Sequence, residues 1–231
     1  MRDAGEREAR GWVTGVVFDF DGVLADSEKV HCRTLSEVVE GLGLAGVGWE
    51  EYKRDLMGFD DRDAFGAVLK ARGVEPEAGL VGRCVEEKAR RFKALAEAGA
   101  VPAMPGAAEF VRACAARVPV GLCSGALRSD TEPVLRQMGL EGVFKAVVTA
   151  EDVKKSKPDP ESYRLCAERL GVFPGRCVAF EDSADGIRSA RGAGFRVAGV
   201  ATTLGEAELR AAGAEWVVGG VGEATWELFM K

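Results

Sequence analysis

Apolar and polar residues follow two different rhythms along this chain. Between about residues 28 and 100, apolar residues recur with helical spacing, as Leu35, Val38, Val39 and Leu42 do at i, i+3, i+4 and i+7. Similar patterns predict further helices near residues 50–56, 62–72 and 81–98. No strand pattern interrupts this part of the sequence, so we expect an all-helical block here.

The rest of the chain alternates short apolar runs with amphipathic segments. The apolar runs predict strands near residues 16–18, 118–123, 146–149, 177–180, 197–201 and 216–218. Strands that alternate with helices predict an α/β fold with a parallel, doubly wound, Rossmann-like sheet. The helical block then interrupts this pattern after the first strand. We therefore expect a core domain of residues 1–27 and 104–231, with residues 28–103 as a helical lid (cap) domain.

Two carboxylates directly follow the first predicted strand. Asp19 and Asp21 are separated by one residue, so both side chains point to the same side of an extended segment. Like charges at this separation repel each other, and the pair needs a cation or a shared proton. Mg²⁺ suits a site with one or two carboxylates, waters and a substrate phosphate.

Three further strand ends carry polar residues that a doubly wound sheet would bring to the same crevice. Ser124 and Gly125 follow the second strand and offer a hydroxyl beside a glycine, where backbone N–H groups can approach an anion. Lys157 lies in a proline-rich loop after the third strand, and Glu181 and Asp182 end the fourth. A metal site beside an oxyanion site is what phosphoryl transfer requires.

Four segments resemble, in order, the four motifs of the haloacid dehalogenase superfamily. They are Asp19-Phe-Asp21-Gly-Val-Leu-Ala-Asp-Ser27, Ser124, Lys157-Pro-Asp-Pro and Glu181-Asp-Ser-Ala-Asp-Gly-Ile187. The helical block directly after the first motif is similar to the β-phosphoglucomutase-like branch of that superfamily. The resemblance covers residues 14 to about 220. Each motif alone is short, and their order and spacing give the resemblance its specificity.

The resemblance implies a role for each acidic residue. Asp19 would be the nucleophile that forms an aspartyl-phosphate. Asp21 would be the general acid and then the general base, and it would bind the metal through its backbone carbonyl. Asp182 would be a direct metal ligand, Asp19 would share the ion, and Glu181 would help to balance its charge. The carboxylate at Asp21 also argues against the dehalogenase branch itself, which needs no metal.

The resemblance also implies a phosphate-binding set. Ser124, with Gly125 beside it, and Lys157 would hold the phosphoryl oxygens, with Lys157 acting as a point charge.

Two residues of the helical block are further candidates for substrate contact. His31 stands four residues after Ser27, where sugar-phosphate mutases of this branch carry a cap histidine. It either faces the site or lies on the exposed side of the first cap helix. Arg62 is one position out of step with the mutases' phosphate-binding arginine, and it either contacts substrate or pairs with a neighbouring aspartate.

Composition excludes several other classes of protein. A net charge of −6 and a pI of about 5.1 argue against non-specific binding to nucleic acid or to anionic membranes. No apolar stretch approaches the ~20 residues that span a bilayer, so a cytoplasmic location is expected. His31 is the only histidine, which excludes a Ser-His-Asp triad and a histidine-based zinc site. The six cysteines form no C-x-x-C pair; four sit at apolar positions of helix or strand patterns and are expected to be free core thiols.

The sequence thus favours a Mg²⁺-dependent phosphatase that acts on a small phosphorylated metabolite through an aspartyl-phosphate. The alternative is a β-phosphoglucomutase-type mutase, in which the aspartyl-phosphate survives until a sugar hydroxyl accepts its phosphoryl group. A non-catalytic binding scaffold is a third, remote hypothesis. The sequence names neither the substrate nor the oligomeric state, and it is compatible with a monomer.

Overall fold

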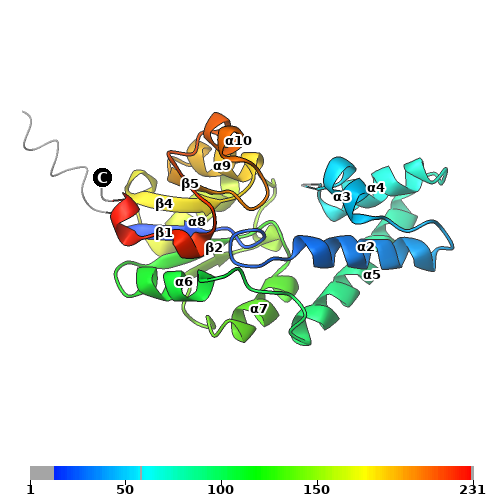
Figure 1. The fold of residues 1–231 in the computed structure, drawn as a ribbon, viewed down its shortest axis with the longest axis horizontal. Coiled ribbons are helices and arrows are strands. Elements are labelled where there is room, and N and C mark those ends of the chain that lie inside the picture. The colour runs from blue at the N-terminus through cyan, green and yellow to red at the C-terminus, as the bar shows by residue number, and fades with distance from the viewer. Residues whose placement is uncertain (1–12, 58, 230–231) are drawn as a thin grey trace, which may run out of the picture. The chain divides into compact units, whose positions relative to one another are not determined.

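The computed structural model describes residues 13–57 and 59–229 of the chain, which form two compact units (Figure 1). The α/β unit combines residues 13–25 with residues 103–229. The helical unit comprises Asp26–Pro102. The chain therefore passes from the α/β unit into the helical unit after Ala25 and returns to the α/β unit at Ala103.

A six-stranded parallel sheet forms the centre of the α/β unit, which confirms the predicted doubly wound fold. The strands are β1 (Gly15–Phe18), β2 (Val120–Cys123), β3 (Ala146–Val148), β4 (Cys177–Glu181), β5 (Arg196–Val200) and β6 (Trp216–Val218). Their order in the sheet is β3-β2-β1-β4-β5-β6. The direction of winding reverses beside β1, and a doubly wound sheet opens its ligand crevice at such a reversal.

The second strand begins two residues later than predicted. The Val118 amide donates to the Cys114 carbonyl (2.9 Å) at the end of the preceding helix, so Val118 still belongs to the helix end. Pro119 has no N–H to donate to a neighbouring strand. The ladder therefore starts at Val120.

Helices connect the strands of the α/β unit. They are α6 (Ala107–Ala115), α7 (Arg128–Gln137), α8 (Glu161–Leu170), α9 (Ala184–Gly192) and α10 (Glu206–Ala212). Short 3₁₀ helices occur at Ala150–Asp152, Pro174–Arg176, Val221–Glu223 and Trp226–Phe229.

The two faces of the sheet bury different side chains, as the alternation along each strand requires. On one face, Val17 and Ala179 pack with Tyr163 and Ile187 in a core that α8, α9 and α10 complete. On the other, Phe18 stacks on Phe180 at 5.1 Å between ring centroids, within a cluster of aromatic rings. Burial on both faces makes β1 and β4 a rigid base for the residues at their ends.

The helical unit contains α2 (Glu28–Gly41), α3 (Trp49–Asp55), α4 (Asp61–Ala71) and α5 (Ala78–Glu97). Leu35, Val39, Phe65 and Leu69 form part of its own apolar core. The start of α4 is set by Asp60, whose carboxylate accepts from the Asp63 amide (2.9 Å) as an N-cap. The last helix starts at Ala78, earlier than its apolar pattern predicts.

All six cysteines are buried and free, which confirms the expectation for the four at apolar positions. Within residues 13–57 and 59–229, no helix combines the length and the apolar character that a membrane crossing requires.

Candidate active site

The carboxyl ends of β1 and β4 place three carboxylates side by side. Phe18 and Phe180 are in register, and the Asp19 amide donates to the Phe180 carbonyl at 3.0 Å. Asp19, Glu181 and Asp182 each offer an oxygen, and these three oxygens lie within 4.8 Å of one another. All three side chains are buried, and we refer to them as the acidic cluster.

Lys157 reaches the acidic cluster from the loop between β3 and α8. Its Nζ donates to Asp19 Oδ1 at 2.6 Å, to Glu181 Oε1 at 2.6 Å and to the Cys123 carbonyl at 3.1 Å. Its side chain is 14% exposed, so most of the ammonium stem is withdrawn from water. The loop thus inserts a single positive charge between two of the carboxylates.

The charges in the acidic cluster do not balance. Burial raises the pKa of Asp19 well above its usual value, and Glu181 adds to this effect, although Lys157 opposes it. Burial and Glu181 raise the pKa of Asp182 to about 8. Burial would lower the pKa of Lys157, but Asp19 and Glu181 outweigh it and hold that pKa well above its usual value. If all three carboxylates were ionised, the cluster would carry more negative charge than one lysine neutralises.

An oxygen-only, anionic cluster of this kind fits a hard divalent cation. Such ions take carboxylate and carbonyl oxygens, and a second positive charge would offset the burial and the repulsion that raise the pKa values of Asp19 and Asp182. The donor set contains no thiolate or imidazole, which softer transition metals prefer.

Glu181 is tied to its surroundings through both carboxylate oxygens. Oε1 accepts from Lys157 and from the Tyr163 hydroxyl (2.7 Å), while Oε2 accepts from the Ser183 hydroxyl (3.2 Å). Sequence reasoning did not single out Tyr163 and missed this contact. The signal available was that a fully buried tyrosine hydroxyl needs a hydrogen-bond partner.

The turn that follows Asp21 packs next to the Asp182 carboxylate of the acidic cluster. Asp21 is half-buried, and its charge contributes to the raised pKa of Asp19. Gly22 has a φ of +69° and donates its amide to the Ala25 carbonyl at 2.9 Å. A left-handed backbone at this point explains why glycine follows Asp21.

Ser124 and Gly125 lie at the end of β2, the strand beside β1. The Ser124 amide donates to the Val148 carbonyl (2.9 Å), and its hydroxyl accepts from the Ala126 amide (2.9 Å). Ser124 is buried, whereas a side chain added at Gly125 would meet open space. The backbone at Gly125 is therefore exposed, and the phosphate-binding role of this turn stays a prediction.

Two threonines of the β5–α10 loop also touch the site, and sequence reasoning missed both. Thr203 donates its hydroxyl to Asp182 Oδ2, and Thr202 donates its hydroxyl to the Gly22 carbonyl at 2.7 Å. The rule that strand ends converge, applied to one more strand, would have pointed to them.

His31 and Arg62 belong to the helical unit. The His31 ring stacks on Phe92 at 4.3 Å between centroids, and its Nδ1 lies 3.0 Å from Lys88 Nζ. Lys88 also pairs with Asp61. Arg62 follows Asp61 on α4 and is exposed.

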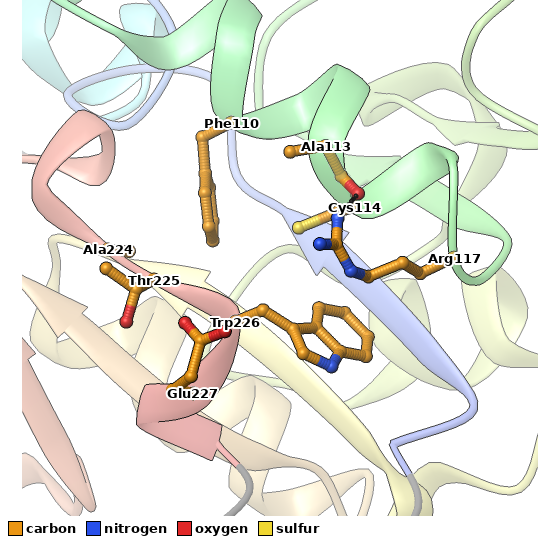
Figure 2. A pocket seen from close by; sticks show the side chains of 8 residues that line it. All are labelled: Phe110, Ala113, Cys114, Arg117, Ala224, Thr225, Trp226 and Glu227. Carbon is orange, nitrogen blue, oxygen red and sulfur yellow. Dashed lines mark hydrogen bonds between the residues drawn. The ribbon is translucent and has the colours of Figure 1, made fainter.

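A separate hollow of about 150 Å³ lies between the end of α6 and the last 3₁₀ helix (Figure 2). Phe110, Cys114, Arg117 and Trp226 help to line it, and the Arg117 guanidinium lies over the Trp226 ring at 5.6 Å. Arg117 precedes β2, so this hollow belongs to the amino ends of the strands. It contains none of the strand-end residues described above.

Comparisons with known proteins find phosphatases among the relatives of this chain. A curated phosphorylated carbohydrates phosphatase of Thermotoga maritima is 34% identical over 193 residues, which cover 83% of this chain and 87% of that protein. The fructose-1-phosphate phosphatase YqaB of Escherichia coli is 31% identical over 182 residues, covering 78% of this chain and 93% of that protein.

Solved structures of related proteins share the fold of this chain. CbbY from Rhodobacter sphaeroides, crystallised with phosphate, superimposes with a TM-score of 0.80 at 28% identity, covering 91% of this chain and 96% of that one. A putative β-phosphoglucomutase from Thermotoga maritima superimposes with a TM-score of 0.70 at 33% identity, covering 91% of this chain and 95% of that one.

The sequence model of one hydrolase family matches residues 13–194, which include all four strand-end motifs. Because this match spans well over half of the chain, and because relatives above 30% identity carry phosphatase names, the resemblance seen in the motifs is confirmed. The chain belongs to the haloacid dehalogenase-like hydrolases.

Proposed function

We propose that this protein is a Mg²⁺-dependent phosphatase that hydrolyses phosphate monoesters of small metabolites, with sugar phosphates as the substrate class. The observation that carries the proposal is the placement of Asp19. Its carboxylate accepts from Lys157 at 2.6 Å and shares a buried acidic cluster with Glu181 and Asp182 at the reversal point of the sheet. A carboxylate held in this way is oriented for attack on phosphorus.

In the first step, a carboxylate oxygen of Asp19 attacks phosphorus, and the bond from phosphorus to the ester oxygen breaks. Asp21 donates a proton to that oxygen, so the alcohol leaves neutral. Asp19 then carries the phosphoryl group as an acyl phosphate.

In the second step, water attacks phosphorus and gives a proton to Asp21, which now acts as the base. Inorganic phosphate leaves, Asp19 is a carboxylate again, and Asp21 regains the proton it had donated. Lys157 and the Ser124–Gly125 turn would hold the phosphoryl oxygens through both steps.

Asp19 and Asp182, with the Asp21 carbonyl, would hold Mg²⁺, and Glu181 would contribute negative charge beside it. The bound ion would neutralise phosphoryl oxygens and oppose the repulsion between the phosphate and the acidic cluster. The gathering of three buried carboxylates around the single ammonium group of Lys157 supports this assignment.

The helical unit would act as a lid that excludes bulk water and selects the substrate. The names of two relatives, a phosphorylated carbohydrates phosphatase and a fructose-1-phosphate phosphatase, support sugar phosphates as the class. His31 and Arg62 are the residues of this unit that we propose for contact with the substrate.

A sugar-phosphate mutase is the second candidate. It is favoured by the structural similarity to a putative β-phosphoglucomutase at 33% identity. A mutase would form the same aspartyl-phosphate but pass the phosphoryl group to a sugar hydroxyl instead of water.

One experiment tests both functions. The purified protein is incubated with Mg²⁺ and a panel of sugar phosphates that includes fructose 1-phosphate and β-glucose 1-phosphate. Free phosphate and glucose 6-phosphate are both measured, with the Asp19→Asn variant as the control for contaminating phosphatases. Phosphate release by the original protein that is absent from the Asp19→Asn variant supports the phosphatase function. Glucose 6-phosphate formed without a matching amount of phosphate would contradict the phosphatase and support the mutase. Absence of both products contradicts both functions.

A further inference from the structure

The loop between β5 and α10 contacts the proposed metal site but has no part in the steps above. β5 pairs with β4, so the carboxyl end of β5 lies beside the strand that ends at the acidic cluster. Two adjacent hydroxyls, Thr202 and Thr203, follow that end. Each donates to a different segment of the site.

Thr203 acts on Asp182. Its hydroxyl donates to Asp182 Oδ2, and Asp182 is 6% exposed. A carboxylate can rotate about its last side-chain bond, and a hydrogen bond to one oxygen fixes that rotation. Ligating carboxylates are commonly held in this way by a partner that is not itself a ligand.

Thr202 acts on the turn that follows Asp21. Its hydroxyl donates to the Gly22 carbonyl at 2.7 Å. The two contacts lie close together around Gly22. A Cβ atom added at Gly22 would come within 3.2 Å of Thr203 Oγ1 and would also collide with the Asp182 carboxylate. The Gly22 turn, Asp182 and the threonine pair are therefore packed together.

The loop itself is anchored to the sheet. The Ala201 amide donates to the Val218 carbonyl at 2.8 Å, which extends the pairing of β5 with β6 by one residue. The Thr202 amide donates to the Val200 carbonyl at 2.9 Å. The hydroxyls are thus carried on backbone whose position the sheet determines.

We propose that Thr203 is a positioning residue for the cation, because it orients Asp182, and that Thr202 positions Asp21, because it holds the Gly22 turn. This inference rests on the proposed function, in which Asp182 is a Mg²⁺ ligand and Asp21 is the acid and base. Neither threonine needs to touch the ion or the substrate.

The test compares Thr203→Val with Thr203→Ser. Valine keeps the shape of threonine and removes the hydroxyl, whereas serine keeps the hydroxyl and removes the methyl group. Mg²⁺ affinity is measured directly by titration calorimetry, with thermal denaturation in excess EDTA as a check of folding. Thr203→Val should weaken Mg²⁺ binding about 10- to 100-fold, a typical effect of losing such a partner, and Thr203→Ser should stay within about threefold of the original protein.

Thr202→Val separates the two roles. It should lower kcat several-fold while the Mg²⁺ dissociation constant stays within about twofold, because its contact lies on the Gly22 turn and not on Asp182. Equal loss of Mg²⁺ affinity in Thr203→Val and Thr203→Ser would assign Thr203 a packing role and overturn the proposal. So would a Thr203→Val variant that binds Mg²⁺ like the original protein. If the original protein itself binds no Mg²⁺, the metal site of the proposed function fails as well, which distinguishes the two failures.

Discussion

In each unit a lysine that is largely withdrawn from water contacts polar partners, and the two lysines, Lys157 and Lys88, differ in the charge that surrounds them. In the α/β unit, Lys157 donates to Asp19 and Glu181, both at 2.6 Å. In the helical unit, Lys88 pairs with Asp61 and lies 3.0 Å from His31 Nδ1. The side chains of Lys157 and Lys88 are 14% and 5% exposed, so burial alone does not distinguish them.

The surplus of acid distinguishes them. Lys157 faces an acidic cluster of three carboxylates, in which burial and the neighbouring acids raise the pKa values of Asp19 and Asp182, and Asp21 adds a further carboxylate nearby. Lys88 meets one carboxylate and one imidazole, so its charge is balanced within the helical unit. A buried lysine therefore marks a candidate metal site only where acids outnumber it.

The largest effect on activity should come from replacing the aspartate that Lys157 contacts, and the aspartate that Lys88 contacts provides the control. Asp19→Asn removes the proposed nucleophile, and phosphate release should fall by about a thousandfold or more. Asp61→Asn removes the carboxylate beside Lys88 and is the matched control, with activity expected within about tenfold. Initial rates on the preferred sugar phosphate, at equal concentrations of folded protein, provide the measurement. An Asp19→Asn variant that keeps a tenth of the original rate would contradict the nucleophile assignment.

Metal removal should show that the acidic cluster around Lys157 needs a cation and that the surroundings of Lys88 do not. EDTA should abolish phosphate release, and added Mg²⁺ should restore it, because the acidic cluster needs the ion's charge. Mg²⁺ should also raise the melting temperature, since the ion binds the folded state. In Lys88→Met, the Mg²⁺ concentration for half-maximal rate should be unchanged. Activity that persists in EDTA would refute the metal role.

Replacing each of the two lysines tests the next largest effect on activity. Lys157→Met should lower kcat/KM about 100-fold, because a positive charge at the phosphoryl oxygens is lost while Asp19 loses its partner. Lys88→Met removes a lysine of similar burial from the other unit. On p-nitrophenyl phosphate, a small generic ester, it should change kcat/KM by less than about threefold. Equal losses in the two variants would remove the distinction drawn from the charge balance.

The two tyrosines of the chain provide the smallest and best-matched test. Each donates its hydroxyl to a glutamate, Tyr163 to Glu181 at 2.7 Å and Tyr52 to Glu28 at 2.9 Å. Tyr163→Phe should lower kcat about tenfold, because Glu181 loses a partner that orients it toward Lys157. Tyr52→Phe should leave kcat within about twofold.

A double variant makes this test specific to Glu181. If Tyr163 acts through Glu181, adding Tyr163→Phe to Glu181→Gln should cost much less than Tyr163→Phe costs alone. Additive losses in kcat would show that the tyrosine hydroxyl acts elsewhere.

Much of the candidate site could be predicted because its residues share one local signal. Asp19, Ser124 and Glu181 come directly after apolar runs of strand length, Asp182 follows Glu181, and Lys157 lies in the loop after another run. In a parallel doubly wound sheet these ends lie at one edge, so recognising the fold class is sufficient to group the residues. The helical unit was predictable for the same reason, since its apolar periodicity is a short-range property.

His31 shows where this signal ends. Its position in the sequence leaves an outward and a site-facing orientation equally open, because both agree with a helix. Within the helical unit its ring stacks on Phe92, and its neighbour Lys88 is 57 residues away in the sequence. Nothing local specifies such a pair.

The amino-acid sequence was sufficient to predict the order of strands and helices along the chain, the strand-end motifs and the type of chemistry they suit. Which hydroxyl meets which carboxylate depends on how distant segments pack. Tyr163 and Glu181 are 18 residues apart, and Thr203 and Asp182 are 21 residues apart. These pairs form because β4 and β5 are neighbours in a particular register and because α8 packs on the sheet. Periodicity records whether a residue is buried, but a hydrogen-bond partner depends on how distant segments are packed.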